Sequence, residues 1–115
     1  MPEDSKKQPK EQKRVLLIDD EKDMDWVMKR ILTDAGYEVE TAKTGAEGIA
    51  KFLINPKLVP FVILDVQLPD MNGLELLKQI KKIYSRTKVL LVTAFGTQEL
   101  KKLAKQAGAL AVLDK

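Results

Sequence analysis

The chain has 115 residues, the length of one ordinary domain. It holds 20 Lys and Arg against 17 Asp and Glu, a formal net charge of +3, and 44% of its residues are hydrophobic, as is usual for a globular domain. No apolar stretch approaches the roughly 20 residues of a membrane-spanning helix. Cysteine and histidine are both absent, which excludes disulfides, histidine-ligated zinc and a phosphohistidine on this chain. The chemistry that remains is that of carboxylates, hydroxyls, lysines and hard metal ions.

Residues 1–13 are interpreted as a polar leader ahead of a domain that spans 14–115. The leader contains Pro2 and Pro9, is almost wholly polar and shows no periodicity, so we expect it to be disordered. It lacks the apolar core of a signal peptide, which favours a cytoplasmic protein. It also lacks an aromatic side chain to stack on bases, and the remainder of the chain is nearly neutral. Direct binding of nucleic acid is therefore not expected.

Five short apolar segments alternate with four segments of helical periodicity. The expected strands are residues 15–18, 37–42, 61–64, 89–92 and 110–113. The first expected helix places its apolar residues at helical spacing, at Met24, Val27, Met28, Ile31, Leu32 and Ala35. Thr44 and Glu47 are expected to cap the second helix. Its apolar stripe is expected at Ala46, Ile49, Ala50 and Leu53.

The strands at 15–18, 61–64 and 89–92 are apolar at every position rather than at alternate ones. Such strands are buried on both faces, as in a parallel sheet with helices on both sides. Five strands and four crossover helices therefore predict a doubly wound α/β fold around one five-stranded parallel sheet. Ligands bind beyond the carboxyl ends of the strands in such sheets, so the polar residues at those ends are the candidates for function.

Four strand ends carry polar residues, namely Asp19, Asp20 and Glu21, then Asp65, Thr93 and Lys115. If the first and third strands are neighbours, their carboxylates converge, and clustered carboxylates need a cation to offset their repulsion. Mg²⁺ suits a set of oxygen ligands of this kind. A carboxylate in that place can attack phosphorus and form an aspartyl phosphate. The metal and Lys115 would supply positive charge to the phosphoryl oxygens, and Thr93 a hydrogen bond.

Each of these residues also has an ordinary structural interpretation. Acidic residues after a strand commonly cap the next helix, and a terminal lysine such as Lys115 is usually solvated. Asp65 is harder to explain in this way, because it directly follows four apolar residues and has no helix to cap. The functional interpretation rests on their joint placement, since each strand end contributes a residue type that one reaction needs.

These segments, in this order and spacing, resemble the response-regulator receiver domain of two-component signalling. The resemblance is carried by residues 15–21, 64–73, 92–96 and 108–109 with Lys115, and it covers residues 14–115. It implies a flavodoxin-like sheet with strand order 2-1-3-4-5. It also implies that Asp65 accepts a phosphoryl group from a phosphohistidine on a sensor histidine kinase or a histidine phosphotransfer protein, in a Mg²⁺-dependent step of a phosphorelay.

The resemblance further implies a role for each site residue. The metal ligands would be Asp20, Asp65 and the backbone carbonyl of Gln67 directly, and Asp19 largely through water. Lys115 would pair with the phosphoryl oxygens. Thr93 would be the switch hydroxyl, whose movement with the loop after it alters partner binding.

Three departures from the family pattern bear on signalling. Val112 stands where the family often has an aromatic residue, so a rotating aromatic switch is not expected. Phe95, two residues after Thr93, is expected to restrict the water that hydrolyses the acyl phosphate. The sequence stops at Lys115, where receivers continue into a fifth helix. We therefore expect a fragment with one apolar face of the sheet uncovered, open to a further segment, an output domain or self-association.

Two other functions compete with a phosphoryl-accepting switch. A metal-dependent phosphohydrolase with an aspartyl nucleophile would usually carry a second aspartate two residues later, where this chain has Gln67. A receiver-like module that no longer takes phosphate would usually have lost Asp65, Lys115 or an acidic partner, and all are present. We expect a phosphotransfer acceptor that assists its own acylation and hydrolysis, and not an enzyme that turns over a metabolite.

Overall fold

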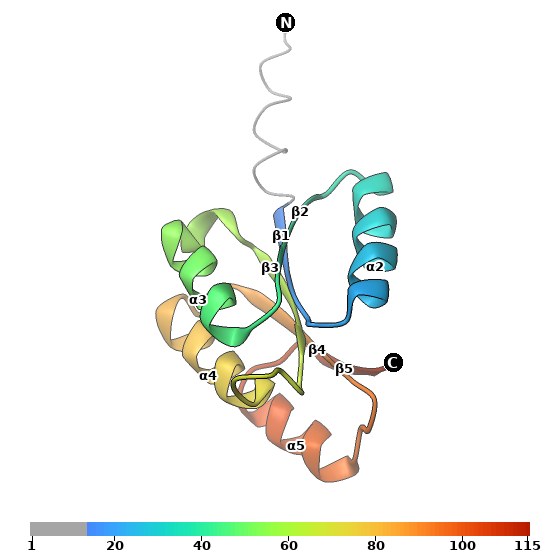
Figure 1. Ribbon diagram of the computed structural model, residues 1–115. Coiled ribbons are helices and arrows are strands. Elements are labelled where there is room, and N and C mark those ends of the chain that lie inside the picture. Colours follow the sequence, from blue (N-terminus) through green and yellow to red (C-terminus); the bar gives the residue numbers. More distant parts are fainter. Residues whose placement is uncertain (1–13) are drawn as a thin grey trace, which may run out of the picture.

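A computed structural model describes residues 14–115, and the expected leader lies outside these residues (Figure 1). The strands are β1 (Arg14–Ile18), β2 (Glu38–Ala42), β3 (Phe61–Asp65), β4 (Lys88–Thr93) and β5 (Ala111–Asp114). The helices are α2 (Lys22–Asp34), α3 (Gly45–Ile54), α4 (Gly73–Ile83) and α5 (Gln98–Gln106), with a 3-10 turn, η2 (Pro56–Leu58). The strands are parallel and lie in the order β2-β1-β3-β4-β5, which confirms the predicted fold.

The helices form two unequal layers. Figure 1 shows α2 on one side of the sheet and α3, α4 and α5 on the other. This division follows from the right-handed crossover rule, because the step from β1 to β2 runs opposite to the later steps. Within residues 14–115, no helix has the length and apolar character needed to cross a membrane.

The larger half of the core lies under the three helices. Phe52 of α3, Leu77 of α4 and Ala104 of α5 are fully buried against the central strands, together with Leu16 and Leu64. The smaller half lies under α2. There Met28 and Leu32 pack against Val15, Leu17 and Ile63. Because β1 and β3 contribute to both halves, they are the best-buried strands of the sheet.

The apolar stripe expected for α3 is wrong. The buried positions of this helix are Gly45, Gly48 and Phe52, whereas Leu53 is half exposed. Gly48 lies so close to β1 that a Cβ atom there would come within 2.5 Å of Ile18 Cδ1. A glycine that permits close packing carries no apolar side chain, so the hydrophobic pattern does not reveal the face that it marks.

The face covered by α2 is only partly closed. Val27 and Ile31, expected on the inner stripe, are exposed, Ile31 by 58%. Leu113 of β5 is beside Val92 in the register and is also exposed. Helix α2 lies over β1 and β2, and no other helix of residues 14–115 lies on this face. The prediction of an uncovered apolar face therefore holds only in part for the described residues: Val15, Leu17 and Ile63 are buried under α2, and the face is open toward Leu113.

The amino end of α3 is capped from two directions. Thr44 accepts a hydrogen bond from the Glu47 N–H (3.0 Å), as expected. The Asp70 carboxylate, in the loop between β3 and α4, accepts from the Gly45 N–H (2.8 Å) and the Ala46 N–H (3.0 Å). These backbone hydrogen bonds hold the pKa of Asp70 below its usual range. Asp70 therefore ties the β3–α4 loop to α3.

Replacing Asp70 with Asn is expected to lower the melting temperature by several degrees at pH 7, because Asn cannot accept charge-assisted hydrogen bonds from two N–H groups. The folded pKa of Asp70 is depressed, so its contribution is present above the unfolded pKa of 3.8 and is lost as pH falls through the folded value. Thermal unfolding at pH 7 and pH 3 measures both effects. Glu40→Gln, on exposed β2, is the control, and an equal loss in both variants would contradict the cap.

Candidate functional site

The residues predicted at the strand ends come together at the carboxyl edge of the sheet. Asp65 and Thr93 are the last residues of β3 and β4, and Asp19 and Lys115 come directly after β1 and β5. The Asp19 N–H donates to the Ala42 carbonyl (2.9 Å) and the Lys115 N–H to the Thr93 carbonyl (2.8 Å). Backbone hydrogen bonds therefore continue one residue past β1 and β5, and they fix the backbone positions of Asp19 and Lys115.

The acidic cluster consists of Asp19, Asp20 and Asp65. One carboxylate oxygen from each lies within 4.8 Å of the others. Asp19 and Asp65 are buried and Asp20 is exposed, so the cluster opens to solvent on one side. Asp19 Oδ1 accepts from the Glu21 N–H (2.9 Å), and Asp65 Oδ1 accepts from the Gln67 N–H (3.0 Å). Each buried carboxylate is thus held through Oδ1, which leaves Oδ2 for other partners.

The electrostatics of the cluster favour a bound cation. Burial raises the pKa of Asp19, as does the neighbouring Asp65, while the Glu21 N–H and Lys115 act in the opposite direction. Burial and the neighbouring Asp65 both disfavour the ionised form of Asp19, and a bound cation would favour it. All the available donors are oxygens, the ligand type that Mg²⁺ prefers. The donor set therefore fits the magnesium ion expected from the sequence.

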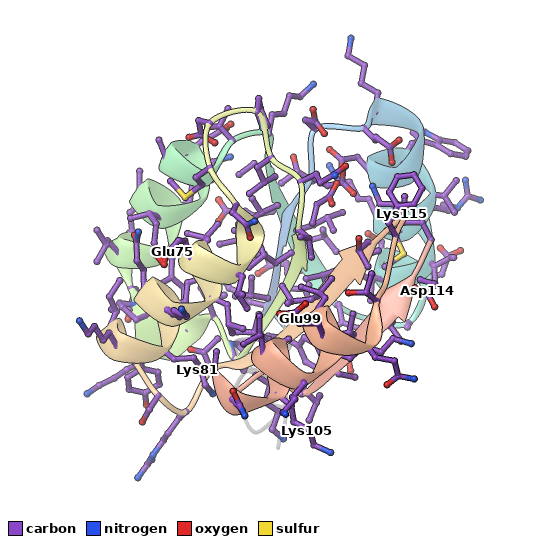
Figure 2. The ribbon with its side chains drawn as sticks, turned by 90° about the horizontal axis from the view of Figure 1, so that it is seen from below. Glu75, Lys81, Glu99, Lys105, Asp114 and Lys115 are labelled. Atoms are coloured by element: carbon purple, nitrogen blue, oxygen red, sulfur yellow. The ribbon has the colours of Figure 1, made fainter. Side chains whose placement is uncertain are left out.

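Lys115 lies inside this group of carboxylates. Its Nζ is 2.8 Å from Asp65 Oδ2, 3.6 Å from Asp19 Oδ2 and 2.6 Å from Glu21 Oε1. Burial disfavours the charged ammonium, but the hydrogen bonds to Asp65 and Glu21 outweigh it and raise the pKa of Lys115 above its ordinary value. Figure 2 shows Lys115 beside the amino end of α2. The solvated terminal lysine of the ordinary interpretation is not what the structure shows.

Thr93 is buried beside this pocket. Its Oγ1 accepts a hydrogen bond from the Phe95 N–H (3.1 Å), so its own proton remains able to donate to a further oxygen. The Phe95 side chain is 74% exposed. Val112, which occupies the expected aromatic position, is half-buried and packs against the core under α5.

Two contributors to the pocket were not predicted. Glu21 was named among the polar residues at the strand ends, but the contact of its carboxylate with Lys115 was not predicted, because it joins residues 94 positions apart and no local pattern signals it. Asp25 lies one helical turn into α2, and its buried Oδ1 has no hydrogen-bond partner among the described residues. Burial, reinforced by Asp19, raises the pKa of Asp25 to about 6. The sequence signal that could have identified Asp25 is an acidic side chain close to the start of the helix that follows Asp19 and Asp20.

The comparisons with known proteins agree with this geometry. A family model described as the response regulator receiver domain matches residues 15–115. The chemotaxis protein CheY of Thermotoga maritima is 38% identical over 99 residues, 84% of this chain and 80% of that protein. The transcriptional regulatory protein CpxR homolog of Haemophilus influenzae is 36% identical, and the match covers 84% of this chain but 40% of that regulator.

Solved structures show the same similarity. A CheY-like response regulator receiver domain protein from Methanospirillum hungatei superimposes with a TM-score of 0.82 at 38% identity, over 90% of this chain and 81% of that one. The CheX–CheY–BeF3–Mg²⁺ complex from Borrelia burgdorferi gives a TM-score of 0.85 at 27% identity, over 89% of this chain and 77% of that one.

The raised pKa of Asp25 leads to a pH-dependent prediction. Its ionised form is disfavoured in the folded state, so its destabilising effect is absent below the unfolded pKa of 3.8 and complete above pH 6. Asp25→Asn is therefore expected to stabilise the metal-free protein at pH 7.5 by about 1 kcal/mol, a value reduced for solvent screening. Urea unfolding in EDTA at pH 7.5 and pH 4 measures this, and an equal gain at both values would exclude the titration as its cause.

Proposed function

The chain belongs to the response regulator receiver domain family, the phosphoacceptor signalling switch of two-component systems, and we propose that Asp65 is its acceptor. The observation that carries this proposal is the arrangement of the Asp65 carboxylate. Its Oδ1 is held by the Gln67 N–H, and its Oδ2 faces the Lys115 ammonium at 2.8 Å. A buried carboxylate held in this way has one oxygen that can attack phosphorus once the cation beside it turns to the incoming phosphoryl group.

In the proposed reaction, Asp65 Oδ2 attacks the phosphorus of a phosphohistidine on the partner protein. The new O–P bond forms as the P–N bond breaks, and the electron pair of that bond leaves with the imidazole. The Lys115 ammonium moves from Asp65 to the phosphoryl oxygens. The Thr93 hydroxyl donates a hydrogen bond to one of these oxygens, which changes the loop that follows β4 and thereby the binding of partners.

Mg²⁺ would be held by Asp19, Asp20, Asp65 and the backbone carbonyl of Gln67. When bound, it supplies positive charge that lowers the cost of bringing an anionic phosphoryl group among carboxylates. The loop that carries Gln67 is closed by a bridge to Asn72, whose side chain also caps α4 through the Leu74 N–H (2.7 Å). This loop is therefore well ordered by local contacts before any ligand binds.

The acceptor role favours a switch over turnover of a metabolite. A phosphohydrolase of similar fold would need an acid–base carboxylate at position 67, and the exposed Gln67 offers none. We propose that the same pocket assists both the formation and the hydrolysis of its own acyl phosphate. Retention of the whole pocket disfavours a module that no longer takes phosphate.

The proposed phosphodonor is a sensor histidine kinase or a histidine phosphotransfer protein, as membership of the receiver family implies. The chain has no histidine of its own, which is consistent with a donor imidazole on the partner. The proposed location is the cytoplasm. Residues 14–115 form the proposed receiver domain. The output is a partner protein or an attached domain, since the relatives include both CheY proteins and transcriptional regulators. The part of the apolar face that α2 leaves open, near Leu113, offers a surface for such an attachment or for self-association.

Intact-protein mass spectrometry after incubation with acetyl phosphate tests the acceptor. The wild-type chain is expected to gain one alkali-labile phosphoryl group in Mg²⁺ and none in EDTA. Asp65→Asn should gain none in either condition, because its amide is not a nucleophile. Asp114→Asn, which removes an exposed carboxylate near the same edge, is the matched control and should behave as wild type. A folded wild-type chain that gains no mass would refute the proposal.

The role of Phe95 is tested through the lifetime of the phosphorylated protein. Phe95→Ala is expected to shorten this lifetime several-fold, because a methyl group blocks the attacking water less than a phenyl ring does. The decay of the phosphorylated mass after removal of the donor measures it. Phe95→Leu, which keeps most of the bulk, should retain most of the wild-type lifetime, and an unchanged lifetime in the Ala variant would contradict the role.

A further inference from the structure

A carboxylate outside the acidic cluster holds the Lys115 ammonium. Glu21 Oε1 is 2.6 Å from Lys115 Nζ, closer than Asp65 Oδ2 at 2.8 Å. The Lys115 side chain is 13% exposed and the Glu21 side chain 57%. The ammonium therefore lies between the buried acceptor and a carboxylate at the mouth of the pocket.

The backbone around Glu21 explains why its side chain is available for this contact. Glu21 is the N-cap residue of α2, yet its side chain makes no capping hydrogen bond. Its N–H donates to Asp19 Oδ1, and its carbonyl accepts from the Asp25 N–H (3.0 Å). The backbone of Glu21 is thus fixed on both sides, while its carboxylate reaches across the pocket to the residue after β5.

This contact competes with the chemistry proposed for the site. Attack by Asp65 Oδ2 requires the electron pair that the Lys115 ammonium engages, and the ammonium must then turn to the phosphoryl oxygens. Glu21 binds the same ammonium and adds a negative charge at the mouth, where an anionic donor enters. An ion pair open to solvent on one side is weak enough to be exchanged during the reaction.

We propose that Glu21 is a positioning residue that restrains Lys115 in its unphosphorylated arrangement and thereby slows phosphorylation of Asp65. The contact therefore lowers the rate at which a given concentration of donor phosphorylates the domain. This inference rests on the proposed function, since it assigns Glu21 a role in the same phosphoryl transfer.

The first test compares initial rates of phosphorylation by acetyl phosphate in Mg²⁺. Glu21→Gln is expected to raise the rate roughly two- to fivefold, as fits the loss of a half-exposed ion pair. Glu75→Gln is the matched control, because Glu75 is 60% exposed, pairs with Lys78 at 3.9 Å and lies away from Lys115 in Figure 2. Its rate should equal that of the wild type.

Glu21→Asp separates the contact from the charge. Aspartate keeps the negative charge but is one methylene shorter, so it should lose the contact and accelerate phosphorylation as Gln does. A wild-type rate in Glu21→Asp would mean that charge alone acts and would overturn the restraint. A rate for Glu21→Gln that is unchanged or slower would also overturn it.

A second readout does not depend on phosphorylation. In EDTA, Glu21→Gln is expected to lower the urea midpoint when it is introduced into the wild-type chain. The same substitution introduced into Lys115→Met should leave the midpoint unchanged, because that variant has already lost the ion pair. Equal decreases in both backgrounds would show that the contact is absent, and the inference would fail.

A wild-type chain that takes no phosphoryl group would overturn the proposed function and this inference together. Normal wild-type phosphorylation with an unchanged Glu21→Gln rate would overturn the inference alone.

Discussion

Repulsion between Asp19 and Asp65 is the constraint on which the site depends. The order of the sheet places β1 beside β3, so two buried carboxylates must face each other at the carboxyl edge. Backbone N–H groups hold one oxygen of each, and the Lys115 ammonium lies near the other. Such a group is stable only while its charges are offset. The same requirement makes the pocket receptive to a divalent cation and to an anion that arrives with one.

The helices on the two faces of the sheet contribute differently to the site at its carboxyl edge. The three helices on one face bury the larger part of the core, and Asp70 links the loop that follows the acceptor strand β3 to α3. Helix α2 contributes less burial but brings Glu21 and Asp25 to the mouth of the pocket. Helix α2 and its N-cap residue therefore add two acidic side chains to the charged groups that the strand ends supply.

Much of this arrangement could be predicted from the sequence. Uninterrupted apolar strands predicted the parallel sheet. The polar residues at or just after the strand ends, Asp19, Asp65, Thr93 and Lys115, were predicted to meet, because the carboxyl ends of parallel strands share one edge. The inner face of α3 was missed because Gly48 packs by having no side chain. The partner of Lys115 at Glu21 was missed because the contact joins residues 94 positions apart through the exposed end of a long side chain.

Lys115 follows β5, an edge strand of the sheet whose side chains are mostly exposed. Strand β5 has four residues and pairs with β4 alone. Edge elements with little burial open locally far more often than the core does. Each such opening withdraws the cation from the acidic cluster while β1 and β3 stay intact. Contacts that hold β5 against β4 therefore also hold the Lys115 ammonium beside Asp65.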